Sequence, residues 1–108
     1  AEVSRDACAI AILNGEGLES PTIGGAKAAN QLLDISGIKA SFVITEYNEK
    51  IYISARSIDE VNVQLVMEKL GGGGHMSIAG AQLTGCTVKE AVDTIKETLD
   101  NMLAEGEI

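Results

Sequence analysis

Four consecutive glycines stand directly before the only histidine of the sequence, in the segment Gly71–His75. One glycine is enough to end a helix, and each glycine inside an ordered segment costs roughly 0.5–1 kcal/mol of backbone entropy relative to alanine. A run of this kind is typical of backbone that approaches a ligand closely, with inward N–H groups that form an anion-binding nest. The same composition also suits a flexible hinge, and the sequence leaves this alternative open.

The glycine run does not match the two common phosphate-binding motifs. A Walker A loop continues with Lys and then Ser or Thr, whereas His75 follows Gly74 here. A Rossmann fingerprint spaces its glycines as G-x-G-x-x-G between a strand and a helix, whereas this run follows an expected helix. If the run binds phosphate, it therefore does so in another way.

His75 stands where a functional histidine is expected, because four glycines leave it few packing neighbours and much access to solvent. A histidine without such a context is more often a hydrogen-bonded structural residue. The chain contains no second histidine, and no Cys or Asp lies near His75 at ligand spacing. We therefore expect no complete metal site within this chain. No Ser or Cys stands in a recognisable nucleophile motif either.

Arg56 ends the segment Ile51–Arg56, which is rich in residues that favour strands. Because side chains alternate along a strand, Arg56 shares one face with Tyr52 and Ser54. Its planar guanidinium matches a phosphate group bidentately. An exposed charge at a strand end would leave the same pattern in the sequence, so this alternative also stays open.

The net charge of −8 argues against a surface that follows long nucleic acid. Only eight Lys and Arg residues are present, and they are scattered rather than gathered in a basic stripe. An anionic ligand would therefore need a small local site. Cys8 and Cys86 lie far apart in the sequence, and we expect both to be reduced. No segment approaches the roughly 20 apolar residues of a membrane span, and no signal peptide is visible.

The elements that must position these residues follow from hydrophobic patterns and capping signals. Ser20 before Pro21 predicts a helix start, and Thr87 with Glu90 forms a capping box. Ser57 with Glu60 predicts a further capping box. Strands are expected at Ala7–Leu13, Ala40–Glu46, Ile51–Arg56 and Ala79–Leu83, and helices from Pro21 to Gly37, over Val61–Leu70 and from Val88 to Leu103. The fold class is α/β, a single small domain with a mixed β-sheet flanked by helices, because the hairpin of the middle strands requires one antiparallel pair.

Several segments resemble the DHH-associated C-terminal domain of DHH-family phosphoesterases. They are ISARS at Ile53–Ser57, VNVQLVMEKLGGGGH at Val61–His75 and AGAQL at Ala79–Leu83. The resemblance covers residues 26 to 103, and GGGGH after a valine-rich helix is its most specific part. Within the family, ASFVI at Ala40–Ile44, ISARS and the Gln-Leu that ends AGAQL are most similar to the cyclic-di-AMP phosphodiesterases of the GdpP type.

This resemblance implies that residues 1–108 are the substrate-binding domain of a longer, metal-dependent phosphodiesterase that cleaves cyclic di-AMP. It implies a catalytic role for His75, and substrate contacts from Arg56, Ser57, Gly71, Gly72, Gly73, Gly74 and His75. No metal ligand is expected here, because the resemblance places manganese in a DHH catalytic domain of the same polypeptide. The 108 residues alone should therefore be inactive.

The expected partners are a cyclic dinucleotide or short oligonucleotide and the DHH domain, and a homodimer is left open. The resemblance implies a cytoplasmic domain without membrane contact of its own, in a parent protein that is membrane-anchored. An oligonucleotide-trimming DHH exonuclease is the alternative within the same chemistry. A nucleic-acid-binding module like the C-terminal domain of alanyl-tRNA synthetases, or a structural domain with a glycine hinge, would be of a different class.

Overall fold

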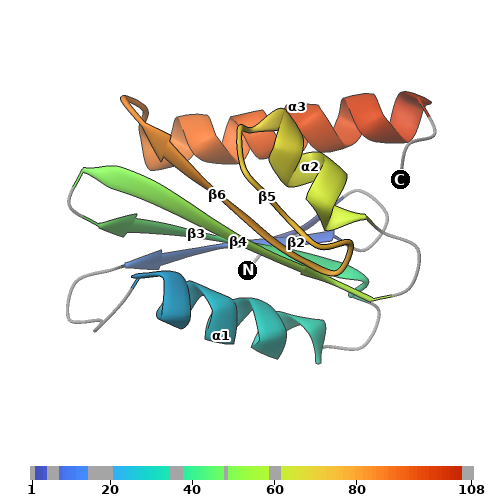
Figure 1. The fold of residues 1–108 in the computed structure, drawn as a ribbon, viewed down its shortest axis with the longest axis horizontal. Coiled ribbons are helices and arrows are strands. Elements are labelled where there is room, and N and C mark those ends of the chain that lie inside the picture. Colours follow the sequence, from blue (N-terminus) through green and yellow to red (C-terminus); the bar gives the residue numbers. More distant parts are fainter. Residues whose placement is uncertain are drawn as a thin grey trace.

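The computed structural model describes residues 2–4, 8–14, 21–34, 38–47, 49–58 and 62–105. They form three helices and a single sheet (Figure 1). In chain order the elements are β1 (Glu2–Ser4), β2 (Cys8–Asn14), α1 (Pro21–Leu33), β3 (Ala40–Tyr47), β4 (Lys50–Ser57), α2 (Val63–Lys69), β5 (Gly73–Gly74), β6 (Ile78–Thr84) and α3 (Val88–Glu105).

The sheet has six strands in the order β1-β2-β3-β4-β6-β5. Strands β2 and β3 are parallel and are connected through α1, whereas the other neighbouring pairs are antiparallel. The expected mixed α/β sheet is therefore confirmed. Strand β4 lies between β3 and β6, and it pairs with each of them along its length.

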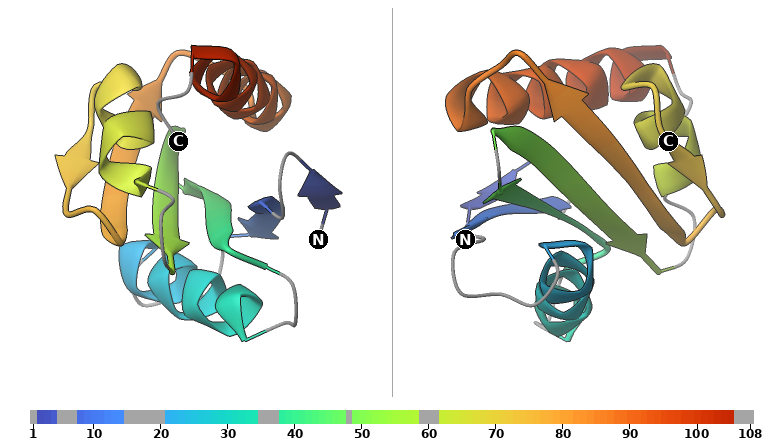
Figure 2. Two further views of the ribbon diagram at one scale, coloured as in Figure 1. Left: turned by 90° about the vertical axis from the view of Figure 1, so that its right-hand side faces the viewer. Right: turned by 60° about the vertical axis from the view of Figure 1, so that its left-hand side comes forward.

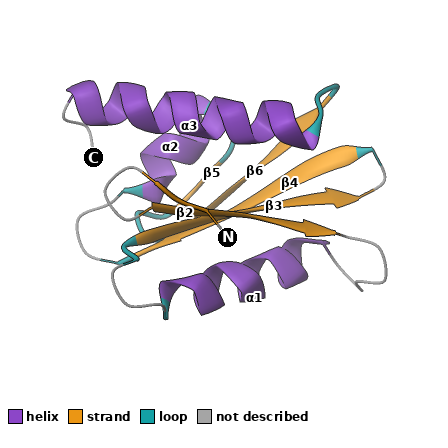
Figure 3. Cartoon of the chain, turned by 180° about the vertical axis from the view of Figure 1, so that it is seen from behind, coloured by secondary structure: helices purple, strands orange, loops and turns teal. Residues whose placement is uncertain are grey.

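The two faces of the sheet are covered by different helices (Figures 2 and 3). On one face α2 and α3 enclose the main core, which includes Phe42, Ile44 and Ile53 of the sheet and Ile95 and Leu99 of α3. These apolar side chains recur at helical and strand spacing, so burying them stabilises both elements at once.

Helix α1 covers the opposite face, where it packs on β3 and β4. This contact is close because Gly25 has no side chain: a Cβ atom there would lie 2.7 Å from the Ser54 Oγ. The Ser41 hydroxyl, which is buried under the helix, donates a hydrogen bond of 2.7 Å to the carbonyl oxygen of Ala29. Figure 2 shows that α1 leaves β6 and β5 uncovered on this face.

The structure confirms most of the elements predicted from the sequence. Helix α1 begins at Pro21, as predicted, while the caps expected at Ser20 and Gly37 lie outside the described residues. At the start of α3, the Thr87 N–H donates to Glu90 Oε1 at 2.9 Å and the Glu90 N–H to Thr87 Oγ1 at 3.1 Å. This reciprocal pair is the capping box that the sequence predicts.

The predicted cap of α2 is wrong. Helix α2 begins at Val63, and its N-cap is Asn62, whose Oδ1 accepts a hydrogen bond of 3.2 Å from the Leu65 N–H. Ser57 is instead the last residue of β4, and Glu60 lies outside the described residues. The prediction also missed β1 and β5, which are only three and two residues long.

Candidate functional site

The first two glycines of the run end helix α2. The Gly71 N–H donates to the Glu68 carbonyl at 3.1 Å, and the Gly72 N–H donates to the Met67 carbonyl at 2.8 Å. This pair of bonds is a Schellman motif, which needs a residue in the left-handed region, and Gly71 has a φ of 86°. These two amides therefore bond within the chain, which leaves the later glycines of the run for the expected anion nest.

The next residues form a short antiparallel ladder with β6. Gly73 lies opposite Gly80 and Gly74 opposite Ala79, and the His75 N–H donates to the Ile78 carbonyl at 2.6 Å. Because hydrogen-bonded and non-bonded pairs alternate in such a ladder, the Gly73 N–H faces β6 and the Gly74 N–H faces away from it. The run is therefore fixed by the helix end and by β6, unlike a free hinge. It leaves one amide, that of Gly74, directed outward.

The glycines of the run differ in how much space they have. A Cβ atom on Gly72 would collide with the Gly80 carbonyl oxygen and would lie 2.7 Å from the Ala81 Cα. On Gly74, which has a φ of 145°, it would lie 2.6 Å from the Ala79 Cα. A Cβ atom on Gly73 would meet nothing within 4 Å. Gly72 and Gly74 are thus required by close packing, whereas Gly73 is not required by any contact within the described chain.

A pocket of about 650 Å³ lies over this part of the sheet. Its centre is a row across three strands in which Ser54 of β4 lies opposite Gly80 of β6, and Gly80 lies opposite Gly73 of β5. Two neighbouring rows bound it: Arg56 with Ile78, and Tyr52 with Gln82. The central row carries one small side chain and two glycines, so the floor of the pocket is largely backbone.

Arg56 lies at one end of the pocket and is half-buried. Its Nη1 donates to the carbonyl oxygens of Ala55 at 2.8 Å and Ala79 at 3.5 Å, which holds the guanidinium over β4 and β6. Partial burial removes water from the charged group and lowers the pKa of Arg56 from its usual value. Both bonds use the same nitrogen, so the remaining N–H donors of the fork are available for an anion.

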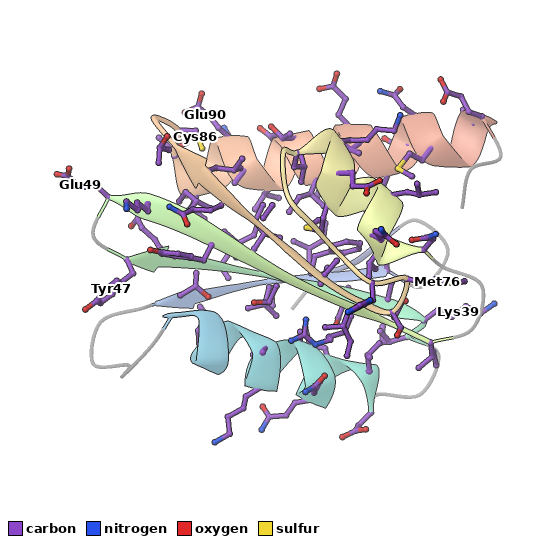
Figure 4. All side chains as sticks on the ribbon, viewed as in Figure 1. Lys39, Tyr47, Glu49, Met76, Cys86 and Glu90 are labelled. Atoms are coloured by element: carbon purple, nitrogen blue, oxygen red, sulfur yellow. The ribbon has the colours of Figure 1, made fainter. Side chains whose placement is uncertain are left out.

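His75 also lines the pocket, and its side chain is exposed. It begins the turn between β5 and β6, and the exposed Met76 follows it at the edge of the molecule (Figure 4). The backbone bond to Ile78 fixes where the turn begins, whereas the imidazole faces solvent. The structure therefore brings Arg56, the glycine run and His75 together around one pocket, although 14 residues separate Arg56 from Gly71 in the sequence.

Ser57 is not among the residues that line the pocket. It is buried, its hydroxyl donates to the Met76 carbonyl at 3.2 Å, and its N–H donates to the Ser77 carbonyl at 2.9 Å. In this structure Ser57 thus supports the turn that follows His75. Neither Tyr52 nor Gln82 was predicted as a site residue from the sequence. The face that Tyr52 shares with Arg56 was a usable signal, whereas Gln82 becomes visible only once the register of β6 is known.

The charge of the pocket differs from that of the whole chain. The sequence has 16 acidic residues against eight basic ones, yet none of the described residues that line the pocket is Asp or Glu. Arg56 is the permanent charge there, and it therefore makes the site locally attractive to anions.

Within the described ranges, no group of three or more His, Cys, Asp or Glu residues is placed to hold a metal ion. These residues therefore do not fit a resident manganese ion. No helix among the described residues is long and apolar enough to cross a membrane. Cys8 is buried and Cys86 is partly buried.

Several known proteins are similar to this chain in sequence or in fold. A family model described as the DHHA1 domain matches residues 8–105. Cyclic-di-AMP phosphodiesterase PdeA of Listeria monocytogenes is 45% identical over 100 residues, which are 92% of this chain and 15% of that protein. Cyclic-di-AMP phosphodiesterase GdpP of Bacillus subtilis is 45% identical over 82 residues, which are 75% of this chain and 12% of that protein. The chain thus spans less than a fifth of these two curated relatives.

More distant relatives are also found. The bifunctional oligoribonuclease and PAP phosphatase NrnA of Thermus thermophilus is 34% identical over 72 residues, which cover 67% of this chain and 22% of that protein. Among solved structures, an exopolyphosphatase-related protein of Bacteroides fragilis has a TM-score of 0.72 at 23% identity, over 84% of this chain and 28% of that one. The C-Ala domain of alanyl-tRNA synthetase from Aquifex aeolicus has a TM-score of 0.68 at 20% identity, and the match covers 92% of this chain and 96% of that one. At these identities the two structures show the shared fold alone.

Proposed function

Because this chain belongs to the DHHA1 domain family, whose members named above include phosphodiesterases, we propose that it binds the substrate of a cyclic-di-AMP phosphodiesterase. The observation that supports this most is the pocket itself, in which Arg56, the backbone of Gly73 and Gly74, and His75 surround a floor without bulky side chains. An acidic chain with a local anion-binding pocket suits a small phosphate-containing ligand better than a long one.

In this proposal the residues of the chain hold the substrate from three directions. The free N–H donors of Arg56 bind phosphate oxygens as a fork. The outward N–H of Gly74 donates a further hydrogen bond, as backbone amides do in anion sites. His75, exposed at the rim, donates to the phosphate that reacts and thereby stabilises charge in the transition state. Ser57 acts indirectly, because it holds the turn after His75 in place.

The metal-dependent step belongs, in this proposal, to another domain of the same polypeptide. The described residues do not fit a metal ion, so we derive no hydrolytic step from them. The manganese-binding residues would lie in a DHH domain of a longer protein, which would itself be membrane-anchored. The 108-residue chain would then bind substrate without cleaving it.

A short oligonucleotide and a long RNA are the two alternative ligands. A short oligonucleotide presents the same phosphates, and the relative from Thermus thermophilus is named an oligoribonuclease. The C-Ala domain shares the fold at 20% identity, which carries no statement about tRNA. The net charge of −8 and the scattered basic residues weigh against a long RNA.

The test compares these ligands directly by calorimetric titration of the chain with cyclic di-AMP, the linear dinucleotide and a longer RNA. We expect the two dinucleotides to bind and the longer RNA to bind more weakly. A parallel assay with manganese should show hydrolysis of cyclic di-AMP by the full-length protein and none by the 108 residues. Preferential binding of long RNA, or turnover by the 108 residues alone, would contradict the proposal.

A further inference from the structure

The end of the pocket opposite Arg56 has a different chemistry. Tyr52 of β4 and Gln82 of β6 lie directly opposite each other, and both line the pocket. Tyr52 precedes Arg56 by four residues on the same strand face, which places the two Cα atoms ~13 Å apart at the usual rise of a strand. That span is comparable with the length of a nucleoside monophosphate from its phosphate to the far edge of its base.

We propose that Tyr52 and Gln82 form a nucleobase subsite, and that Gln82 makes this subsite selective for adenine over guanine. The inference rests on the proposed function, because it takes the phosphate to lie at Arg56. The new element is the nucleobase, which the end of the pocket opposite Arg56 would recognise.

The floor between the two ends leaves room for the sugar. Ser54, Gly80 and Gly73 form the central row, and a Cβ atom on Gly73 would meet nothing within 4 Å. A ribose can therefore cross this row close to the backbone. Because α1 packs over Ser54, the ligand then extends over the uncovered backbone of β6 and β5, between the end of the pocket at Arg56 and the end at Tyr52.

Tyr52 provides the aromatic surface of this subsite. It is half-buried, so part of the ring is already fixed by the protein and part remains accessible. Stacking on an aromatic side chain is a general way in which proteins hold an unpaired base, and it tolerates any base because each has a π-face. Tyr52 therefore contributes affinity without choosing between adenine and guanine.

Gln82 makes the subsite selective for adenine over guanine. Its amide is exposed and forms no hydrogen bond with another described residue. A glutamine amide offers one acceptor and one donor group side by side, which matches the N6 donor and N7 acceptor of adenine. Guanine presents O6 and N7, two acceptors, on the same edge, so the carbonyl oxygen of Gln82 would face an acceptor.

The experiment measures kcat/KM of the full-length protein for cyclic di-AMP and cyclic di-GMP. In the unchanged protein the ratio should favour the adenine ligand on the order of ten- to a hundredfold. Gln82→Leu, which removes both polar groups at similar size, should bring the ratio close to one. Gln82→Glu, which can only accept, should shift the ratio further toward guanine, because guanine offers the N1 and N2 donors on its other edge.

Control variants separate this effect from a general disturbance. Gln31→Leu makes the same change on the exposed surface of α1 and should leave both values unchanged. Tyr52→Leu should lower kcat/KM for both ligands about equally. Tyr52→Phe, which retains the aromatic ring, should leave kcat/KM for both ligands unchanged. Tyr47→Leu, at an end of β3 outside the pocket lining, should have little effect (Figure 4).

The outcomes distinguish the two proposals. If the full-length protein cleaves cyclic di-AMP but Gln82→Leu leaves the ratio of the two ligands unchanged, the base subsite is overturned and the proposed function stands. If the unchanged protein cleaves neither cyclic dinucleotide, the proposed function fails, and the base subsite fails with it. A ratio that moves toward one in Gln82→Leu, with Gln31→Leu unaffected, supports the subsite.

Discussion

Gly73 lies directly opposite Gly80 in the β5–β6 ladder, so two residues without side chains face each other across the floor of the pocket. Their neighbours behave differently. Gly72 and Gly74 cannot accept a Cβ atom, because β6 lies against them, whereas the corresponding space at Gly73 is open. Packing within the chain therefore requires glycine at positions 72 and 74. At position 73 only a closely bound ligand would require it.

Gly73→Ala should weaken ligand binding without affecting the fold. The added methyl group meets nothing within 4 Å in the chain, so the melting temperature should change little. It would stand in the centre of the pocket floor, where we expect it to reduce affinity for cyclic di-AMP at least roughly tenfold, as a steric obstacle to a closely bound ligand does. Calorimetric titration and thermal unfolding of the same preparation measure both effects.

Gly72→Ala is the matched control for this prediction. Its methyl group would collide with the Gly80 carbonyl oxygen, so we expect a loss of unfolding free energy of about 1–3 kcal/mol, as for other overpacked sites. If Gly73→Ala and Gly72→Ala lowered the melting temperature equally, the distinction between the two glycines would be wrong. If Gly73→Ala bound ligand normally, the pocket floor would not be the binding surface.

Arg56→Lys should impair binding even though it keeps the positive charge. An ammonium group cannot reproduce the fork of N–H donors, so we expect a loss of about 1–3 kcal/mol in binding free energy. Arg56→Gln should be at least as severe. Lys27→Gln, on the exposed surface of α1, removes one charge from the whole chain and serves as the control. If Arg56→Gln and Lys27→Gln weakened ligand binding equally, Arg56 would act only through the net charge of the chain and would not contact the ligand.

His75→Ala should reduce the turnover of the full-length protein by about two orders of magnitude, the typical effect of removing one transition-state donor. Its side chain is exposed, so the melting temperature should stay unchanged. Met76→Ala, the same truncation at the next exposed position of the turn, should leave turnover nearly normal. A fall in melting temperature for His75→Ala would indicate a structural role instead.

Asn62→Ala should destabilise the chain by about 0.5–2 kcal/mol, because it removes the acceptor for the Leu65 N–H at the start of α2. Ligand affinity should change little, since Asn62 does not line the pocket. Asn30→Ala, the same change on the exposed side of α1, should be neutral or slightly stabilising, because alanine favours helices. Urea denaturation measures both, and a neutral Asn62→Ala would contradict the assigned cap.

The sequence predicts local features well and contacts between distant segments poorly. The capping box of Thr87 and Glu90 involves neighbouring residues only, and the structure confirms it. At Ser57 the same motif is misleading, because that residue pairs within the sheet and Asn62 caps the helix instead. Local pattern cannot decide between two capping side chains when a strand competes for one of them.

The shape of the pocket could not be predicted, because it depends on the register of three strands. Arg56 and the glycine run were predicted as site residues from residue type and resemblance. However, a two-residue glycine strand has no local signal, since glycine is depleted in strands and β5 exists through its pairing with β6. For the same reason, the position of Gln82 opposite Tyr52 emerged only with the structure.

The most direct test of the account is a nuclear magnetic resonance titration of the 108-residue chain with cyclic di-AMP. We expect the amide signals of Gly73, Gly74 and Gly80 to shift with added ligand, together with the side-chain signals of Arg56. The signals along the solvent face of α3 should stay in place. Gly73→Ala should weaken these shifts at the same ligand concentration. Shifts gathered on α3 or on α1, with the signals of the pocket unchanged, would contradict the account.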